Sequence, residues 1–187
     1  KLIQINIGQF DANKHGAIPL QADAKIALQQ LSLSLGHWQS QPQWNELIDH
    51  VNQDWRETYE QVTVNTNSEL PSDAQVLGAV KRQSSPRDVV VCAAGGLPGE
   101  LHKLWRCEDS KSYHVEYGFS CMGYEIAGGL GVKMASPDRD VFIVVGDGSY
   151  MMMNSELATS VMIGQKIIVI VLDNRGYGCI NRYKWRP

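Results

Sequence analysis

The sequence predicts an α/β protein built around a three-layer parallel sheet, and three observations support this. Short runs of Val and Ile, such as Val89–Val91 and Ile167–Val171, are typical of strands that are buried on both faces. Segments with apolar residues at helical spacing lie between these runs, so strands and helices alternate. The chain has 187 residues, 43% of them apolar, which is enough to bury a sizeable core.

The composition excludes several classes of protein. The 17 Lys and Arg residues against 20 Asp and Glu residues give a formal charge of −3, and no basic stripe indicates a nucleic-acid surface. The apolar runs are far shorter than the ~20 residues that a membrane-spanning helix needs. Cys92, Cys107, Cys121 and Cys179 form no CxxC pair and no zinc-ligand spacing, so we expect reduced thiols.

The first part of the chain is typical of the end of an upstream unit and a connection. Leu2–Ile7 alternates apolar and polar residues, as a strand with one buried face does. Ala22–Leu35 has apolar residues at helical spacing, so we assign residues 1–37 to the upstream unit. Gln41–Val62 is a second amphipathic helix, and residues 38–66 are therefore expected to be a connecting helix and linker.

The main alternating pattern lies in residues 67–187, which we expect to be incomplete at their C-terminal end. Helices and strands alternate throughout this part, and the strands carry the Val and Ile runs. We expect helices at Pro71–Gln83, Gly99–Trp105, Gly123–Met134 and Ser155–Ile163, and strands at Asp88–Ala93, Tyr113–Tyr117, Asp140–Val145 and Lys166–Leu172.

In a parallel sheet, ligands bind beyond the carboxyl ends of the strands, where two loops are of interest. The first is Ala94–Gly99, and Glu116 ends the strand that follows it. This arrangement lacks one glycine of the dinucleotide-binding fingerprint, in which an acidic residue binds the ribose. The loop is therefore either part of a nucleotide-binding module or an ordinary turn between a strand and a helix.

The second loop, Gly146–Ser149, ends a buried strand and precedes a helix. Its glycines allow backbone N–H groups to approach a phosphate, and a helix amino terminus favours an anion. Asp147 offers a hard oxygen ligand, and Asn174 follows the next strand. Oxygen ligands on neighbouring loops suit a magnesium ion bound to a diphosphate. The alternative is that Asp147 and Asn174 are ordinary turn residues.

The Gly146–Gly148 sequence, followed by a helix, an apolar strand and Asn174, resembles the cofactor motif of thiamine diphosphate-dependent enzymes. The resemblance implies a thiamine diphosphate-binding fold that needs thiamine diphosphate and Mg²⁺. It also implies that the side chains of Asp147 and Asn174 and the backbone carbonyl of Gly176 bind the metal. The family often has two Asn residues where this chain has Asp173 before Asn174, and the resemblance implies no role for that carboxylate.

A second segment, Ser120–Ala127, resembles the part of the same family that carries a bulky apolar residue before a glycine-rich helix. The resemblance implies that Met122 holds thiamine in a bent shape, with the Met122 amide facing the pyrimidine ring and the Ser120 carbonyl facing its amino group. Without the resemblance, Met122 would be assigned to the core. The complete set of expected cofactor-binding residues is Ser120, Cys121, Met122, Gly146, Asp147, Gly148, Ser149, Asn174 and Gly176.

The resemblance extends along most of the chain. The first 35 residues resemble the end of the central domain of the acetolactate synthase group, and the rest resembles its diphosphate-binding domain. Within that group, Gly95–Trp105, Glu116–Glu125 and Asn174–Arg182 resemble the cyclic-diketone hydrolases of inositol catabolism. This implies hydrolysis of a carbon–carbon bond that opens a cyclic 1,2-diketone to 5-deoxyglucuronate. The alternatives are a carboligase or decarboxylase acting on pyruvate or glyoxylate, and a non-catalytic nucleotide-binding module.

The resemblance also has implications for partners. In the family, the glutamate that activates the cofactor lies on a pyrimidine-binding domain, normally of a second subunit, and no segment here resembles that domain. We therefore assign no catalytic residue within this chain and expect it to be inactive alone. A cytoplasmic homodimer or homotetramer is implied. His102 and His114 are expected to have packing or surface roles rather than to contact substrate.

Overall fold

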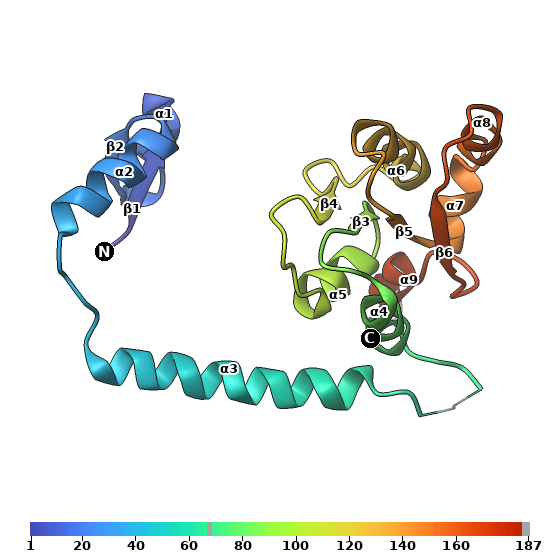
Figure 1. The fold of residues 1–187 in the computed structure, drawn as a ribbon, viewed down its shortest axis with the longest axis horizontal. Coiled ribbons are helices and arrows are strands. Elements are labelled where there is room, and N and C mark those ends of the chain that lie inside the picture. Colours follow the sequence, from blue (N-terminus) through green and yellow to red (C-terminus); the bar gives the residue numbers. More distant parts are fainter. Residues whose placement is uncertain (67–68, 185–187) are drawn as a thin grey trace. The chain divides into compact units, whose positions relative to one another are not determined.

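The computed structural model describes residues 1–66 and 69–184, which divide into two compact units, Lys1–Gln53 and Asp54–Pro187 (Figure 1). The domain boundary expected at residue 67, and the end of the chain at 185–187, lie outside the described residues. No helix in the described ranges is both long enough and apolar enough to cross a membrane.

The first unit contains a small parallel sheet. Strand β1 (Ile3–Asn6) pairs with β2 (Ile18–Gln21), and helix α1 (Gln9–Ala12) and a 3-10 turn (Lys14–Gly16) connect them. Helix α2 (Ala24–Leu35) follows, and the Asp23 side chain caps it by accepting hydrogen bonds from two backbone amides. The expected strand and helix are confirmed. β2 was not expected, because a short segment that contains Pro19 gives no alternating pattern.

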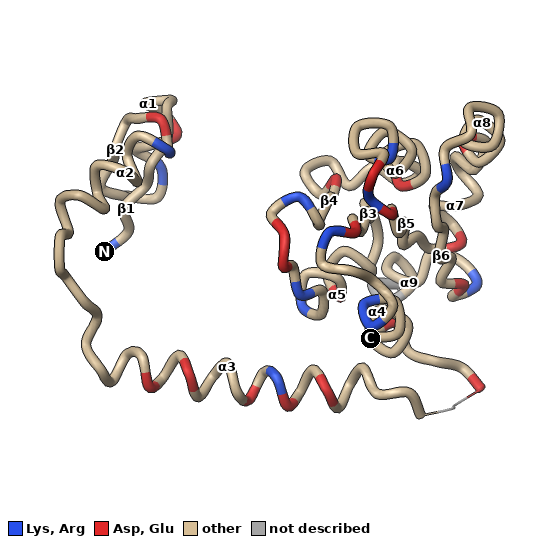
Figure 2. Tube along the Cα trace, in the orientation of Figure 1, with Lys and Arg blue, Asp and Glu red and all other residues tan. Residues whose placement is uncertain are grey.

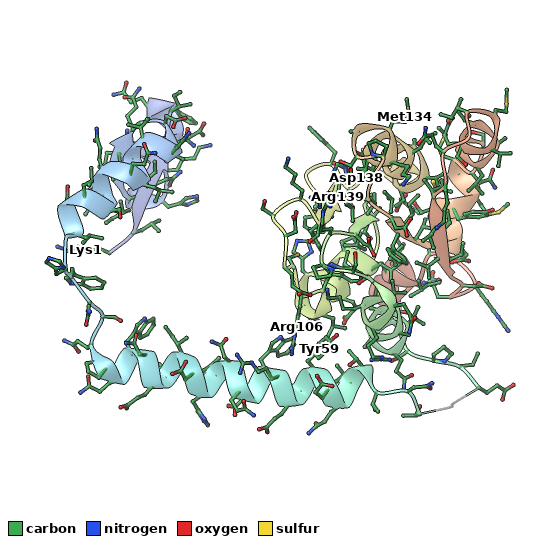
Figure 3. The ribbon with its side chains drawn as sticks, in the orientation of Figure 1. Lys1, Tyr59, Arg106, Met134, Asp138 and Arg139 are labelled. Carbon is green, nitrogen blue, oxygen red and sulfur yellow. The ribbon has the colours of Figure 1, made fainter. Side chains whose placement is uncertain are left out.

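Helix α3 (Pro42–Thr63) confirms the expected helix, and its C-terminal end belongs to the second unit. The role of residues 38–66 as a connection stays a prediction. Tyr59 and Thr63 are buried there, and Arg106 lies 4.1 Å above the Tyr59 ring (Figure 3). Helix α4 (Asp73–Gln83) packs closely against Thr63, because a Cβ atom at Gly78 would overlap its side chain. The end of α3 is therefore part of the second unit's core.

A four-stranded parallel sheet in the order β4-β3-β5-β6 forms the centre of the second unit. It confirms the predicted fold class. All four residues of β3 are buried, as its run of Val residues indicated. The strands are β3 (Val89–Cys92), β4 (Tyr113–Val115), β5 (Val141–Gly146) and β6 (Ile168–Leu172).

Helices cover both faces of this sheet, which gives the three layers (Figure 1). Val90 and Cys92 pack with α4 and with α5 (Leu97–Leu104) on one face. Val89 and Val91 pack on the other face, in a cluster that includes Ile126 of α6 (Tyr124–Ala135). Alternate side chains of one strand thus enter two separate cores, as the pleat of a strand requires.

Three further helices complete the second unit within the described residues. Helix α8 (Glu156–Met162) confirms an expected helix, whereas α7 (Asp147–Met152) and α9 (Gly178–Lys184) were not expected. Because β5 continues to Gly146, α7 begins directly at Asp147. Asp147 therefore lies in the first turn of a short helix and not in a loop ahead of one.

Charged side chains organise the amino ends of the strands. Arg139 donates hydrogen bonds to both carboxylate oxygens of Asp109, at 3.0 and 3.2 Å, and to the backbone carbonyl of Arg87. The bond from Arg139 lowers the pKa of Asp109. Elsewhere Lys and Arg are scattered among Asp and Glu rather than gathered on one element (Figure 2). This network fixes the end of the sheet opposite the candidate site.

A stability prediction follows from the close packing of α6 on β5. A Cβ atom at Gly129 would overlap the Ile143 side chain, whereas one at Gly131 on the same helix would meet nothing within 4 Å. We expect Gly129→Ala to lower the free energy of unfolding by about 1–3 kcal/mol through overpacking. Gly131→Ala should raise it by about 0.5–1 kcal/mol, because alanine favours a helix. Denaturant unfolding measures both, and equal effects would contradict the packing argument.

Candidate functional site

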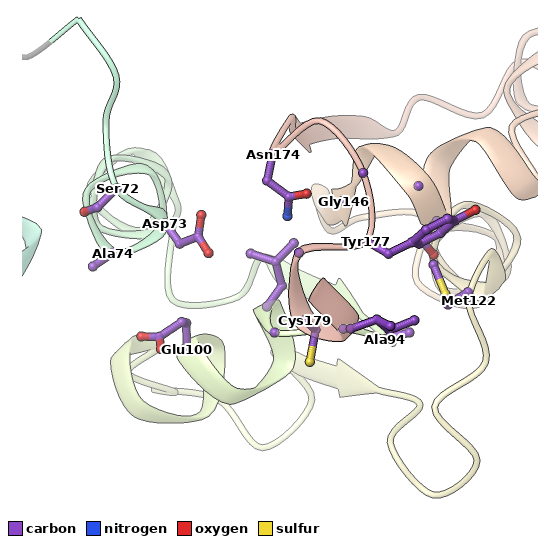
Figure 4. A pocket seen from close by; sticks show the side chains of 18 residues that line it. Ser72, Asp73, Ala74, Ala94, Glu100, Met122, Gly146, Asn174, Tyr177 and Cys179 are labelled. Atoms are coloured by element: carbon purple, nitrogen blue, oxygen red, sulfur yellow. The ribbon is translucent and has the colours of Figure 1, made fainter. Parts of the chain in front are cut away.

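A cavity of about 480 Å³ lies at the carboxyl ends of the strands in the second unit (Figure 4). Segments after β3, β5 and β6 line it, together with Met122 and the first residues of α4. Figure 4 shows Met122 and Tyr177 on one side, and Asp73 and Glu100 on the opposite side. The cavity is therefore where a parallel sheet is expected to bind a ligand.

Glycines give the cavity a wall of exposed backbone. A Cβ atom at Gly95, Gly96 or Gly146 would meet nothing within 4 Å, so nothing covers the backbone there. At Gly148 a Cβ atom would lie 2.7 Å from Cε1 of Tyr177, so the Tyr177 ring rests on this glycine. A backbone free of side chains is what phosphate oxygens need in order to reach N–H groups.

Asp147 carries a buried oxygen that has no partner. Its Oδ2 atom accepts a hydrogen bond from the Gly176 amide at 2.8 Å. Its Oδ1 atom is buried and accepts no hydrogen bond from any described residue. A buried carboxylate oxygen left unsatisfied is costly, and a bound cation would remove the cost. This oxygen fits the expected magnesium ion.

The turn after β6 carries neutral amide and carbonyl oxygens and lies beside Asp147. Asn174 lines the cavity, and the bond from Gly176 holds this turn against Asp147. Asp173 accepts a hydrogen bond from the Arg175 amide at 2.9 Å, so its carboxylate shapes the turn. No group of three His, Cys, Asp or Glu side chains suited to a metal occurs in the described chain. One carboxylate with amide and carbonyl oxygens is a set that Mg²⁺ accepts.

Of the residues expected to bind the cofactor, the structure gathers most around this one cavity. Met122 is half-buried and lines it, as do Gly148 and Ser149. Ser120, Cys121 and Asp147 are not among the lining residues, although Asp147 lies between two that are, Gly146 and Gly148. Ser120 and Cys121 are exposed, and the assignment of all three stays a prediction.

Comparison with known protein families identifies the kind of domain that contains this cavity. Residues 93–185 match the model described as "Thiamine pyrophosphate enzyme, C-terminal TPP binding domain". The chain belongs to the thiamine pyrophosphate enzyme family. The matched residues include the glycine-lined wall, Asp147 and Asn174.

Relatives of this thiamine pyrophosphate-binding domain carry a more specific name. The chain is 38% identical to "3D-(3,5/4)-trihydroxycyclohexane-1,2-dione hydrolase" of Geobacillus thermodenitrificans, over 97% of this chain and 32% of the relative. The proteins of that name from Bacillus licheniformis and Bacillus subtilis are 38% and 37% identical, with the same coverage. The chain thus spans about a third of the length of the curated relatives it matches.

The loop that carries Met122 in this domain is held by Glu116. One carboxylate oxygen accepts from the Phe119 amide at 3.0 Å and the other from the Cys121 amide at 2.7 Å. These two bonds, the one from Cys121 first, lower the pKa of Glu116. Both carboxylate oxygens of Glu116 already accept hydrogen bonds from the loop. Glu116 is therefore not free to bind a ribose, as the nucleotide-binding alternative would require.

The lowered pKa of Glu116 predicts how its contribution changes with pH. A carboxyl whose pKa is lower folded than unfolded stabilises the fold above its ordinary pKa, and the effect is lost as pH falls. Glu116→Gln should therefore lower the unfolding temperature at pH 7, and this loss should shrink as the pH falls below the ordinary glutamate pKa of about 4.3. Cys121 is the titratable side chain that bonds to Glu116, and its pKa is raised by desolvation and by the Glu116 charge, so it stays protonated in this range. A difference that is constant with pH would contradict this.

Glu125 is the residue that sequence reasoning missed. It lies in the first turn of α6 and is only 1% exposed. Its Oε1 atom accepts from the Ala94 amide at 3.2 Å, and its Oε2 atom accepts from the Gly123 amide at 3.0 Å and from Ser149 Oγ at 2.8 Å. The signal available was one acidic residue at the start of a helix of small and apolar residues.

The two histidines contact tyrosines and do not line the cavity. Nδ1 of His102 lies 2.6 Å from the Pro98 carbonyl oxygen and 2.9 Å from the Tyr113 hydroxyl. Nε2 of His114 lies 2.7 Å from the hydroxyl of Tyr124, whose ring stacks on it. These contacts favour the packing roles expected for both.

Proposed function

We propose that this domain binds thiamine diphosphate and Mg²⁺ in an enzyme that opens the ring of trihydroxycyclohexane-1,2-dione. The product would be 5-deoxyglucuronate, and the reaction would belong to myo-inositol catabolism. The names of the relatives support the substrate. The observation that carries the cofactor assignment is the buried, unpartnered oxygen of Asp147, which lies in the chain between the cavity-lining residues Gly146 and Gly148.

Different residues of the chain would bind the diphosphate and the metal ion. The diphosphate would be held by backbone N–H groups at Gly146, Gly148 and Ser149 rather than by side chains. Asp147 and Asn174, with the carbonyl of Gly176, would hold Mg²⁺ and so neutralise the diphosphate charge.

Orientation of the cofactor would fall to Met122, whose side chain faces the same cavity as the glycine-lined wall. Thiamine diphosphate supplies, when bound, the nucleophilic carbon and the electron sink that cleavage of a carbon–carbon bond requires. The protein's part is to orient that group and to place charge around it. In the overall reaction, one water molecule supplies the oxygen of the new acid group.

We further propose that the activating glutamate comes from a pyrimidine-binding domain of a second subunit. The enzyme would then act as a homodimer or homotetramer in the cytoplasm. The 187-residue chain alone should show no turnover above background.

Calorimetric titration of thiamine diphosphate into the intact protein, with and without Mg²⁺, tests the cofactor assignment. Binding that depends on Mg²⁺ is the expected result, and turnover is then compared on the cyclic dione, pyruvate and glyoxylate. Activity on pyruvate or glyoxylate alone would replace the hydrolase with a carboligase or decarboxylase. A folded protein that binds a nucleotide but no thiamine diphosphate would overturn the proposal.

A further inference from the structure

Two carboxylates hold the backbone on both sides of Met122. The amide of Cys121, which precedes Met122, donates to Glu116, and the amide of Gly123, which follows it, donates to Glu125. The amide of Phe119 donates to Glu116 as well. The conformation of Met122, which faces the cavity, is thus fixed from two sides.

The backbone held in this way is one that a free chain rarely adopts. Ser120 has φ 52° and Gly123 has φ 91°, both in the left-handed region. A serine in that region costs about 1 kcal/mol or more unless its surroundings impose it. The two carboxylates supply that constraint, because their three amide bonds bracket Ser120 and end at Gly123.

Glu125 does more than hold one loop. Its three hydrogen bonds come from the segments after β3, before α6 and after β5, at Ala94, Gly123 and Ser149. The Ser149 hydroxyl also accepts from the Gly123 amide at 2.7 Å, which closes the network. One buried group therefore ties the loop of Met122 to the segment that would bind the diphosphate.

The chemistry of this network requires a carboxylate. Its three donors need an acceptor at both oxygens, and a glutamine would turn an N–H group toward one of them. Within the described residues no Lys, Arg or His forms an ion pair with Glu125, so backbone amides, a hydroxyl and the amino end of α6 balance its charge. An apolar residue would fill the space without joining the three segments.

We propose that Glu116 and Glu125 are positioning residues that set the place of Met122 relative to the diphosphate-binding wall. This inference rests on the proposed function, since it concerns the same cofactor. A fixed distance between Met122 and the diphosphate-binding wall favours a ligand that contacts both at once. Neither carboxylate needs to touch the cofactor for this effect.

The test compares two probes in the intact protein, thiamine diphosphate and inorganic pyrophosphate, each titrated with Mg²⁺. Thiamine diphosphate needs both the diphosphate-binding wall and Met122, whereas pyrophosphate needs only the wall. Glu125→Gln and Glu116→Gln should each weaken thiamine diphosphate binding about tenfold, the scale of one hydrogen bond to a charged group. Pyrophosphate binding should change by less than about threefold, so the ratio of the two affinities is the readout.

Controls separate positioning from general loosening. Glu156→Gln, in the first turn of α8 and away from the cavity lining, should change neither affinity. An equal loss of both ligands in the two variants, or no loss in either, would overturn the inference. If Glu125→Gln does not fold, Glu116→Gln decides, because Glu116 is only partly buried. Absence of thiamine diphosphate binding by the unsubstituted protein would instead refute the proposed function.

Discussion

Asp147→Asn is expected to abolish magnesium-dependent binding of thiamine diphosphate while leaving the unliganded protein at least as stable. The substitution keeps an oxygen for the Gly176 amide and replaces the unpartnered Oδ1 with an uncharged amide group. An uncharged amide costs less to bury without a partner than a carboxylate oxygen does. Loss of a metal ligand should weaken binding by more than about 100-fold, since even outer partners of metal ligands contribute about 10- to 100-fold.

Two measurements test whether Asp147→Asn weakens cofactor binding without lowering stability. Thermal unfolding without cofactor compares stabilities, and calorimetry with Mg²⁺ compares affinities for thiamine diphosphate. Asp173→Asn is the matched control, because Asp173 is exposed and an asparagine can also accept the bond from Arg175. A less stable unliganded Asp147→Asn protein that still bound the cofactor would contradict the assignment of Asp147.

Leu101→Ala is expected to lower the free energy of unfolding of the second unit by about 3 kcal/mol. Leu101 lies on α5, is fully buried, and packs in the core that includes Val90 and Cys92 of β3. Alanine removes three carbons and leaves a cavity that a helix packed on a sheet closes only in part. The same helix begins at the glycine-lined wall, so cofactor affinity should fall as well.

Denaturant unfolding followed by circular dichroism measures this loss. Met162→Ala, at a position 85% exposed on α8, is the control and should change stability by less than about 0.5 kcal/mol. Similar losses in the two variants would mean that Leu101 is not a core residue.

The parts of the fold that sequence alone predicts are those with strong local patterns. The Val and Ile run of β3 indicated a buried strand, and its four residues are all buried. The helical spacing along α3 gave its bounds to within a residue. β2 gave no such signal, because its pairing with β1 and not its own four residues makes it a strand.

Some residues of the candidate site could also be predicted from local sequence, and others could not. Asp147 and Asn174 were predicted because Asp147 directly follows β5 and Asn174 lies two residues after β6, where chain position determines place in space. Glu125 was not, because its bonds to Ala94 and Ser149 span 31 and 24 residues and leave no spacing to detect. The position of the Tyr177 ring on Gly148 likewise depends on tertiary packing.

The burial of Cys92 in the central strand makes its thiol a reporter of structural opening. Burial and the nearby charge of Glu125 raise the pKa of this thiol to about 12, and its side chain is fully shielded from solvent. Alkylating reagents attack a thiolate, so Cys92 should react only when the sheet separates. Cys107 is exposed and should react in the native protein, whereas the raised pKa of the exposed Cys121 thiol should slow its reaction. The labelling rate at Cys92, with and without cofactor, would then measure how strongly a bound ligand suppresses opening of the strand beneath it.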